Sequence, residues 1–223
     1  MKNYVLIVAG GKGLRMGHDL PKQFIPLAGK PLLMHTMQVF YRWNATAEIL
    51  LVLPESHQDY WAMLCRELKF VVPHKIVTGG ETRFHSVRNG LNEVRENGLV
   101  AVHDGVRPFV RQEMISACFS EAAFSGAAIP VVPVVDSLRI REGEKSKPVD
   151  RNLYCIVQTP QVFVSTLLLA AYQQPWQEIF TDDASVVEAA GGRVALVEGD
   201  RENIKITTQA DLLYAKMLLE TET

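Results

Sequence analysis

Short apolar runs alternate with stretches of helical spacing along most of the chain. Residues 4–8 and 48–53 are two such runs, and their length and composition predict buried strands. Between them, apolar side chains recur at helical spacing over 31–43. The same two patterns predict the remaining elements. The expected strands are 70–77, 99–103, 127–135, 193–197 and 203–206, and the expected helices are 58–68, 84–94, 111–124, 166–172, 182–190 with Thr181 as its cap, and the stretch after Thr208.

Strands that alternate with helices predict a mostly parallel sheet with helices on both faces, which is a doubly wound α/β fold. Ligands bind such sheets at the carboxyl ends of the strands. The loops after Val8, Val77, His103 and Val135 are therefore expected to share one rim of the sheet and to carry the functional residues.

The least regular part of the chain, residues 136–150, interrupts this alternation. It is charged, contains Gly143 and Pro148, and lies between two extended runs. We interpret 134–156 as a β-arm that protrudes from a single domain spanning 1–223, and not as a boundary between two domains. Such an arm buries little of itself, so we expect a partner chain to cover it.

The composition describes an ordinary globular protein. The chain has 223 residues, 48% of them hydrophobic and 22% charged, with a net charge of −2. A chain of this size can bury a core without staples, and its charge gives no reason to expect nucleic acid or an anionic membrane as a partner. The three cysteines are far apart and form no CxxC pair, which favours a reducing compartment over a disulfide framework or a zinc site. With no signal peptide or long apolar run, the chain is expected to be a cytoplasmic enzyme.

A glycine-rich loop follows the first strand. It contains Gly10, Gly11, Gly13 and Gly17, with Ala9 before them. Glycine lets backbone N–H groups approach a ligand, and successive N–H groups can form an anion-binding nest. The nearby cations are Lys12, Arg15 and Lys22. The sequence therefore predicts a polyphosphate cradle, in which only Lys12 has no role beyond a favourable field.

Other uses of a glycine loop fit less well. A Walker A loop requires GxxxxGK[ST], which is absent. A dinucleotide fingerprint requires GxGxxG, and the spacing from Gly11 through Gly13 to Gly17 is one residue too long. A tight turn with solvated cations remains an alternative for the loop alone. Two cations such as Arg15 and Lys22 would stabilise the charge that develops when the α-phosphorus of a nucleoside triphosphate is attacked. The sequence shows no obvious Ser-His-Asp or Cys-His set for covalent catalysis.

Two further candidates follow predicted strands. In GGETRFHS (79–86), the glycines leave room for a flat group, and Glu81 and Ser86 could bind a base edge. The alternative is an ordinary turn with Thr82 as a helix cap. In HDGVRP (103–108), Asp104 could bind ribose, an acceptor or a metal, or could form a local ion pair with Arg107.

Two more candidates lie later in the chain. Arg151, with Ser137 on the same arm, suits phosphate recognition, unless both are simply solvated. Lys205 alternates with two isoleucines in a predicted strand, where a lone lysine requires an anion unless the strand lies at an edge.

Taken together, the motifs resemble those of the 2-C-methyl-D-erythritol 4-phosphate cytidylyltransferase family. They occur in the expected order over nearly the whole chain: AGGKGLRMG…PKQF, GGETRFHSV, HDGVRPF, QTPQVF, TDDASVVE and GDRENIKITT. The resemblance implies a Rossmann-like nucleotidyltransferase that joins CTP to methylerythritol phosphate and releases pyrophosphate, with Mg²⁺. It also implies a homodimer whose β-arms reach into the neighbouring site.

The resemblance also implies roles for individual residues. Those matching catalytic positions are Arg15, Lys22, Arg151 and Lys205. Those matching the triphosphate loop, the cytosine site and the ribose are Ala9, Gly10, Gly11, Gly13, Gly80, Glu81, Ser86, Asp104 and Gly105. Those matching acceptor contacts are Asp104, Arg107, Ser137, Arg151, Thr159 and Lys205, with Ser137 and Arg151 supplied by the partner's arm. The Mg²⁺ is expected to be held mainly by CTP phosphates.

Some positions depart from the commonest family pattern. Gly10 and Gly105 stand where many members have Ala, Glu81 replaces a frequent Asp, and Ser137 a frequent Thr. The AGG and PKQF motifs also resemble ribitol-5-phosphate cytidylyltransferase, which is therefore an alternative. A protein that binds the nucleotide without turnover is a second alternative.

Overall fold

The computed structural model describes residues 1–10 and 20–221. An eight-stranded sheet forms its centre, and four strands on one side of this sheet are parallel. They are β6 (Gly98–Asp104), β1 (Lys2–Val8), β4 (Glu48–Leu53) and β5 (Lys75–Thr78), in that order. Their carboxyl ends therefore lie at one edge of the sheet, as the alternating pattern predicts.

The other side of the sheet is mixed. β11 (Gln161–Val164) pairs antiparallel with β6 and with β7 (Ala127–Pro133), so β7 again runs in the direction of β6. β10 (Cys155–Val157) and β12 (Ala195–Glu198) both pair with β7, antiparallel and parallel respectively. The sheet is thus doubly wound and mostly parallel, with an antiparallel insertion at β11 that the sequence pattern does not predict.

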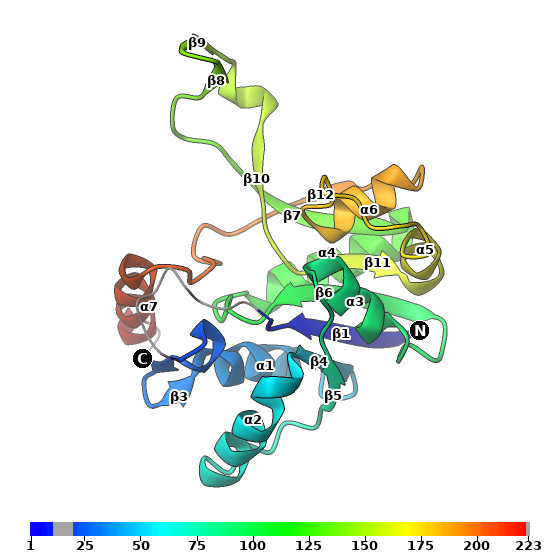
Figure 1. Ribbon diagram of the computed structural model, residues 1–223, viewed down its shortest axis with the longest axis vertical. Coiled ribbons are helices and arrows are strands. Elements are labelled where there is room, and N and C mark those ends of the chain that lie inside the picture. Colours follow the sequence, from blue (N-terminus) through cyan, green and yellow to red (C-terminus); the bar gives the residue numbers. More distant parts are fainter. Residues whose placement is uncertain (11–19, 222–223) are drawn as a thin grey trace.

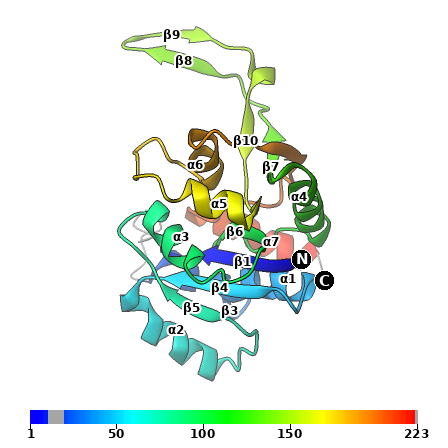
Figure 2. The same ribbon diagram turned by 90° about the vertical axis from the view of Figure 1, so that its right-hand side faces the viewer.

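Helices cover both faces of the sheet because the strands are apolar on both sides. In β1, Val5 and Ile7 join the core on one face, whereas Tyr4 and Leu6 join the core on the other. The first face is covered by α1 (Leu32–Trp43), α2 (Glu55–Glu67) and α4 (Gln112–Ser125). The second is covered by α3 (Arg83–Leu91), α5 (Ser165–Ala171) and α6 (Asp183–Ala189) (Figure 2).

A third, smaller core lies beside the sheet (Figure 1). The last helix, α7 (Gln209–Thr221), packs there against the short hairpin of β2 (Pro26–Leu27) and β3 (Lys30–Pro31). Ile206, in the segment that leads into α7, is fully buried in this core. This core therefore anchors the segment that carries Lys205 at its C-terminal end.

The predicted arm projects well away from the rest of the protein (Figures 1 and 2). Its tip is a hairpin of β8 (Arg139–Glu142) and β9 (Lys145–Pro148), and every residue of these two strands is exposed. A short 3₁₀ turn, Arg151–Leu153, leads back into β10. Leu153 is 80% exposed and Ile156 52% exposed, so the arm presents apolar side chains to solvent.

Three local predictions are wrong. The strand expected over 70–77 is confined to Lys75–Thr78. Residues 203–206 form an extended loop and not a strand, although the Ile206 N–H donates to Val106 O at 3.0 Å. The N-cap of α6 is Asp182 and not Thr181, because Asp182 and Ser185 exchange hydrogen bonds in a capping box. Within residues 1–10 and 20–221, no helix is long and apolar enough to cross a membrane.

Candidate active site

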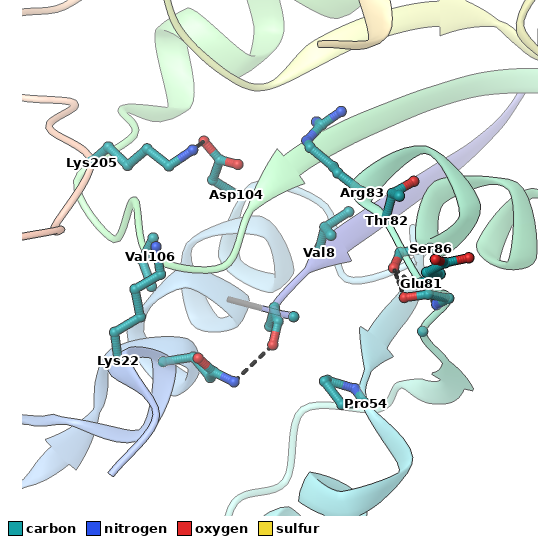
Figure 3. A pocket seen from close by; sticks show the side chains of 15 residues that line it. Val8, Lys22, Pro54, Glu81, Thr82, Arg83, Ser86, Asp104, Val106 and Lys205 are labelled. Atoms are coloured by element: carbon teal, nitrogen blue, oxygen red, sulfur yellow. Dashed lines mark hydrogen bonds and ion pairs between the residues drawn. The ribbon is translucent and has the colours of Figure 1, made fainter. Parts of the chain in front are cut away.

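A cavity of about 290 Å³ lies where the loops after β1, β5 and β6 meet (Figure 3). Three of the four loops predicted to share this rim meet here, whereas the segment after Val135 leads into the arm and does not line the cavity. Lys205 reaches the same cavity from the segment before α7. The predicted site residues that line the cavity are Ala9, Gly10, Lys22, Gly80, Glu81, Ser86, Asp104 and Lys205.

The turn after β5 forms one wall. The Gly80 N–H donates to Ser86 Oγ at 3.0 Å, and Thr82 caps α3 by accepting from the His85 N–H. A Cβ at Gly80 would lie 2.5 Å from His85 Cβ, so a side chain at position 80 does not fit without movement. The predicted helix cap at Thr82 is therefore present, and the same turn forms a wall of the cavity.

Lys22 enters from the opposite wall. It begins a 3₁₀ turn, Lys22–Phe24, and the following Gln23 is fully buried and donates from Nε2 to Ala9 O at 2.8 Å. This hydrogen bond ties the Lys22 turn to the end of β1. Residues 11–19, which include Gly11, Lys12, Gly13, Arg15 and Gly17 of the glycine loop, lie outside the described residues.

Asp104, the last residue of β6, is the centre of a charged cluster. Its Oδ2 lies 3.0 Å from Lys205 Nζ and 3.1 Å from Arg107 Nε. Burial alone would raise the pKa of Asp104, but attraction to Lys205, Arg83 and Arg107 outweighs it and holds the pKa well below the usual value. The predicted ion pair with Arg107 is thus present, and Asp104 is the anion that Lys205 requires.

A second cavity, of about 280 Å³, adjoins the first and shares Arg83, Asp104 and Lys205 with it. Arg107 and Thr159, both predicted as acceptor contacts, line this second cavity and are almost fully buried. The two cavities therefore share a wall made of one carboxylate and two cations.

An ion pair between the half-buried Arg83 and the fully buried Asp183, which the sequence does not predict, supports this wall. Arg83 donates from its two terminal nitrogens to the two carboxylate oxygens of Asp183, at 2.9 and 2.6 Å. The Tyr172 hydroxyl donates to the same carboxylate at 2.6 Å. Burial would lower the pKa of Arg83, but the Asp183 charge raises it above the ordinary value. The two partners are a hundred positions apart, and nothing in their local sequence links them.

The segment before α7 is also fixed by buried amides. The Gln158 Nε2 donates to Asp200 O at 2.7 Å, and the fully buried Asn203 donates from Nδ2 to Thr159 O at 2.8 Å. Arg107 donates from Nη1 to Asn203 O at 2.7 Å. These bonds bring Lys205 to Asp104 without a strand. No local pattern marks these residues, since Gln158 stands between Val157 and Thr159, and Asn203 between Glu202 and Ile204.

The remaining predicted residues lie elsewhere. Ser137 and Arg151 are exposed on the arm, and neither lines either cavity of its own chain. Arg151 donates to the backbone carbonyl of Val135. Gly105 is buried, and its N–H donates to Val8 O at 3.0 Å. A Cβ there would lie 3.0 Å from Ala9 Cβ, so Gly105 packs beside the cavity wall.

An α/β sheet with a polar cavity at the carboxyl ends of its parallel strands is typical of a nucleotide-binding enzyme. The chain matches the 2-C-methyl-D-erythritol 4-phosphate cytidylyltransferase family over residues 3–221. It belongs to that family and is therefore a nucleotidyltransferase enzyme, as its motifs indicate.

Individual relatives agree. The chain is 58% identical over 214 residues to the 2-C-methyl-D-erythritol 4-phosphate cytidylyltransferase of Bacteroides fragilis, with 96% of this chain and 98% of the relative covered. It is 55% identical over 219 residues to that of Phocaeicola vulgatus, covering 98% and 100%. The crystal structure of the Thermus thermophilus protein of the same name matches with a TM-score of 0.81 at 34% identity, covering 99% of this chain and 100% of that one.

Replacing Asp183 is expected to destabilise the protein more than replacing its neighbour Asp182, because only Asp183 forms the ion pair with Arg83. Asp183→Asn leaves the Arg83 charge without its counterion and is expected to lower the free energy of unfolding by about 3 kcal/mol. Asp182→Asn is the neighbouring comparison and is expected to cost about 1 kcal/mol, because Asn caps a helix as well as Asp does and only the hydrogen bond that Asp182 Oδ2 accepts from Gln161 Nε2 is lost. Urea denaturation followed by circular dichroism measures the free energy of unfolding of both variants. Equal losses would contradict the contribution of the ion pair to stability.

Proposed function

We propose that this chain transfers the cytidylyl group of CTP to 2-C-methyl-D-erythritol 4-phosphate, giving 4-diphosphocytidyl-2-C-methyl-D-erythritol and pyrophosphate. The observation that carries the proposal is the family match over residues 3–221. The two adjoining cavities at the rim of the sheet support it, because two substrates that react with each other must bind side by side.

The first cavity suits the nucleotide. The end of β1, with Ala9 and Gly10, offers backbone near the triphosphate, and we place Gly11 and Gly13 of the same loop there. On the facing wall, Gly80, Glu81 and Ser86 surround space for a flat ring. We propose that these three residues read cytosine and that Asp104, beside Gly105, lies toward the ribose.

The second cavity suits the acceptor. It combines Arg107 and Thr159 with the shared Asp104 and Lys205. A sugar-alcohol phosphate carries hydroxyl groups at one end and a dianion at the other. We propose that Lys205, which lines both cavities, holds the acceptor phosphate beside the α-phosphate of CTP.

The chemistry follows from this placement. An oxygen of the acceptor phosphate attacks the α-phosphorus in line, a new P–O–P bond forms, and the bond to the leaving pyrophosphate breaks. No covalent nucleophile from the protein is required. Negative charge grows on the equatorial and leaving oxygens, and we propose that Arg15 and Lys22 stabilise it more in the transition state than in the ground state.

A divalent cation fits this site as part of the nucleotide. Among the described residues, no three His, Cys, Asp or Glu side chains lie close enough to hold a metal ion. Mg²⁺ commonly keeps its waters and uses substrate phosphate oxygens with one or two carboxylates. We propose that Mg²⁺ enters bound to CTP and supplies further neutralisation of the triphosphate.

The arm points to a second copy of the chain. It projects from the rest of the protein (Figure 1) and is mostly exposed, with apolar residues such as Leu153 and Ile156 open to solvent. Ser137 and Arg151 lie on it and line neither cavity of their own chain. We propose a homodimer in which Ser137 and Arg151 complete the partner's acceptor site. Free cysteines are typical of cytoplasmic proteins, and since all three cysteines are free we propose that location as well.

The reaction itself is tested by ³¹P NMR of the protein with CTP, Mg²⁺ and 2-C-methyl-D-erythritol 4-phosphate. The triphosphate signals are expected to give way to those of pyrophosphate and of a diphosphate diester. Ribitol 5-phosphate in a parallel sample is expected to react far more slowly. Faster turnover of ribitol 5-phosphate would contradict the proposed acceptor, and CTP binding without turnover of either acceptor would contradict the proposed reaction.

The arm's role in the partner site is tested by mixing two inactive variants. Lys22→Ala and Arg151→Ala are each expected to lower kcat by about 100-fold or more. If the arm acts on the partner, a mixed dimer retains one intact site. Subunit exchange between equal amounts should then restore about a quarter of wild-type activity, since half of the dimers are mixed.

The control for this experiment is the same mixture before subunits have exchanged. If Arg151 served the site of its own chain, both sites of a mixed dimer would be damaged and activity would not return. That outcome, or a fully active monomer, would contradict the proposed role of the arm.

A further inference from the structure

A chain of three buried hydrogen bonds lies beneath the second cavity. His103 Nε2 is 3.0 Å from Arg107 O, and His103 Nδ1 is 3.1 Å from Thr159 Oγ1. The Asp104 N–H in turn donates to Thr159 Oγ1 at 3.1 Å. His103 is fully buried and lines neither cavity, whereas Thr159 lines the second one. Arg107 and Thr159, which are both proposed to contact the acceptor, are therefore connected through His103, which does not contact it.

The geometry determines the tautomer of His103. A backbone carbonyl only accepts, so the hydrogen bond to Arg107 O requires a proton on Nε2. Burial lowers the pKa of His103 to about 4, although the hydrogen bond to the Arg107 backbone opposes this shift. At neutral pH the ring is thus uncharged, and Nδ1 carries a lone pair. That lone pair faces the Thr159 hydroxyl and accepts a hydrogen bond from it.

The hydroxyl of Thr159 is then nearly fully used. A hydroxyl has one proton to donate and two lone pairs to accept with. Its proton goes to His103 Nδ1, and one lone pair takes the Asp104 N–H. One lone pair remains for a ligand in the second cavity. Thr159 can therefore accept a hydrogen bond from a ligand O–H, but it has no proton to give to a phosphate oxygen.

We propose that His103 is a positioning residue that fixes Thr159 as a hydrogen-bond acceptor, so that this part of the cavity selects a hydroxyl of the acceptor and not its phosphate. The inference rests on the proposed function and deepens it. The carboxylate of Asp104 is a second acceptor in the same cavity, whereas Lys205 is the cation at the shared wall. The acceptor is thereby oriented, with its hydroxyl end at Thr159 and its phosphate at Lys205.

Two variants of His103 separate positioning from packing. Gln places an amide near Nε2, so His103→Gln keeps a donor for Arg107 O and loses the acceptor for Thr159. Asn places its amide near Nδ1, so His103→Asn keeps an acceptor for Thr159 and loses the donor. Both remove the ring that contacts Phe40 at 4.8 Å between centroids, so a packing role would affect them alike.

The KM for methylerythritol phosphate is expected to rise about tenfold in His103→Gln, because the loss of one hydrogen bond to the substrate costs up to about tenfold in affinity. The rise is expected to stay below about threefold in His103→Asn, which keeps that bond. The KM for CTP should change less than twofold in both variants. Thr159→Val should match His103→Gln, and the double variant should be no worse than either. His35→Asn is the control, since His35 Nε2 also bonds a backbone carbonyl, that of Leu27, but His35 lines neither cavity of the site.

Equal effects of Gln and Asn on the acceptor KM, or no effect of Gln, would overturn the proposal. Should both variants fail to fold, long-range ¹H–¹⁵N NMR of the wild-type protein decides the point without any substitution. His103 is expected as the Nε2–H tautomer at neutral pH, and a proton on Nδ1 would overturn the proposal. Because this spectrum needs no turnover, it stays informative even if wild-type protein forms no product, an outcome that would instead refute the proposed function.

Discussion

A carboxylate held among three cations at the end of β6 is the interaction on which the site depends. Asp104 bonds Lys205 and Arg107 directly and lies in the field of Arg83. A buried charge persists only when it is paired and hydrogen-bonded. The cluster therefore fixes the positions of cations that come from three separate segments, and it does so before any phosphate arrives.

The fold supplies each partner by a different device. β6 ends at Asp104, and because its neighbours on one side are parallel to it, this carboxyl end lies at the same edge of the sheet as theirs. Arg83 is fixed by Asp183 across α3 and α6, and Lys205 is brought in by the loop that Asn203 ties to Thr159. Because these partners are preorganised, little reorganisation is needed when charge develops on a reacting phosphate. In the same way, we propose, His103 preorganises the site for the hydroxyl groups of the acceptor.

Much of this could be predicted from local sequence. Apolar runs such as 4–8 predict strands buried on both faces, and glycines and charges at their carboxyl ends predict the rim. The four residues of β11 are too few to show a period, and the extended segment around Lys205 is held by side chains instead of a neighbouring strand. The pair between Arg83 and Asp183 depends on tertiary contacts alone. Long-range polar partners leave no local pattern, so the sequence predicts the motifs but not the bonds that join them.

If Asp104 is ionised and holds these cations together, its contribution to stability must depend on pH in one direction. Its pKa is depressed by folding, so the contribution is complete above the pKa of an unfolded Asp, about 4, and is lost as pH falls through the lower folded value. The most direct measurement is the free energy of unfolding of wild type and Asp104→Asn from pH 7 to 2. The difference, about 3 kcal/mol at neutral pH, should persist to about pH 4 and shrink below it. A difference that is constant to pH 2, or absent at pH 7, would contradict the central role of Asp104.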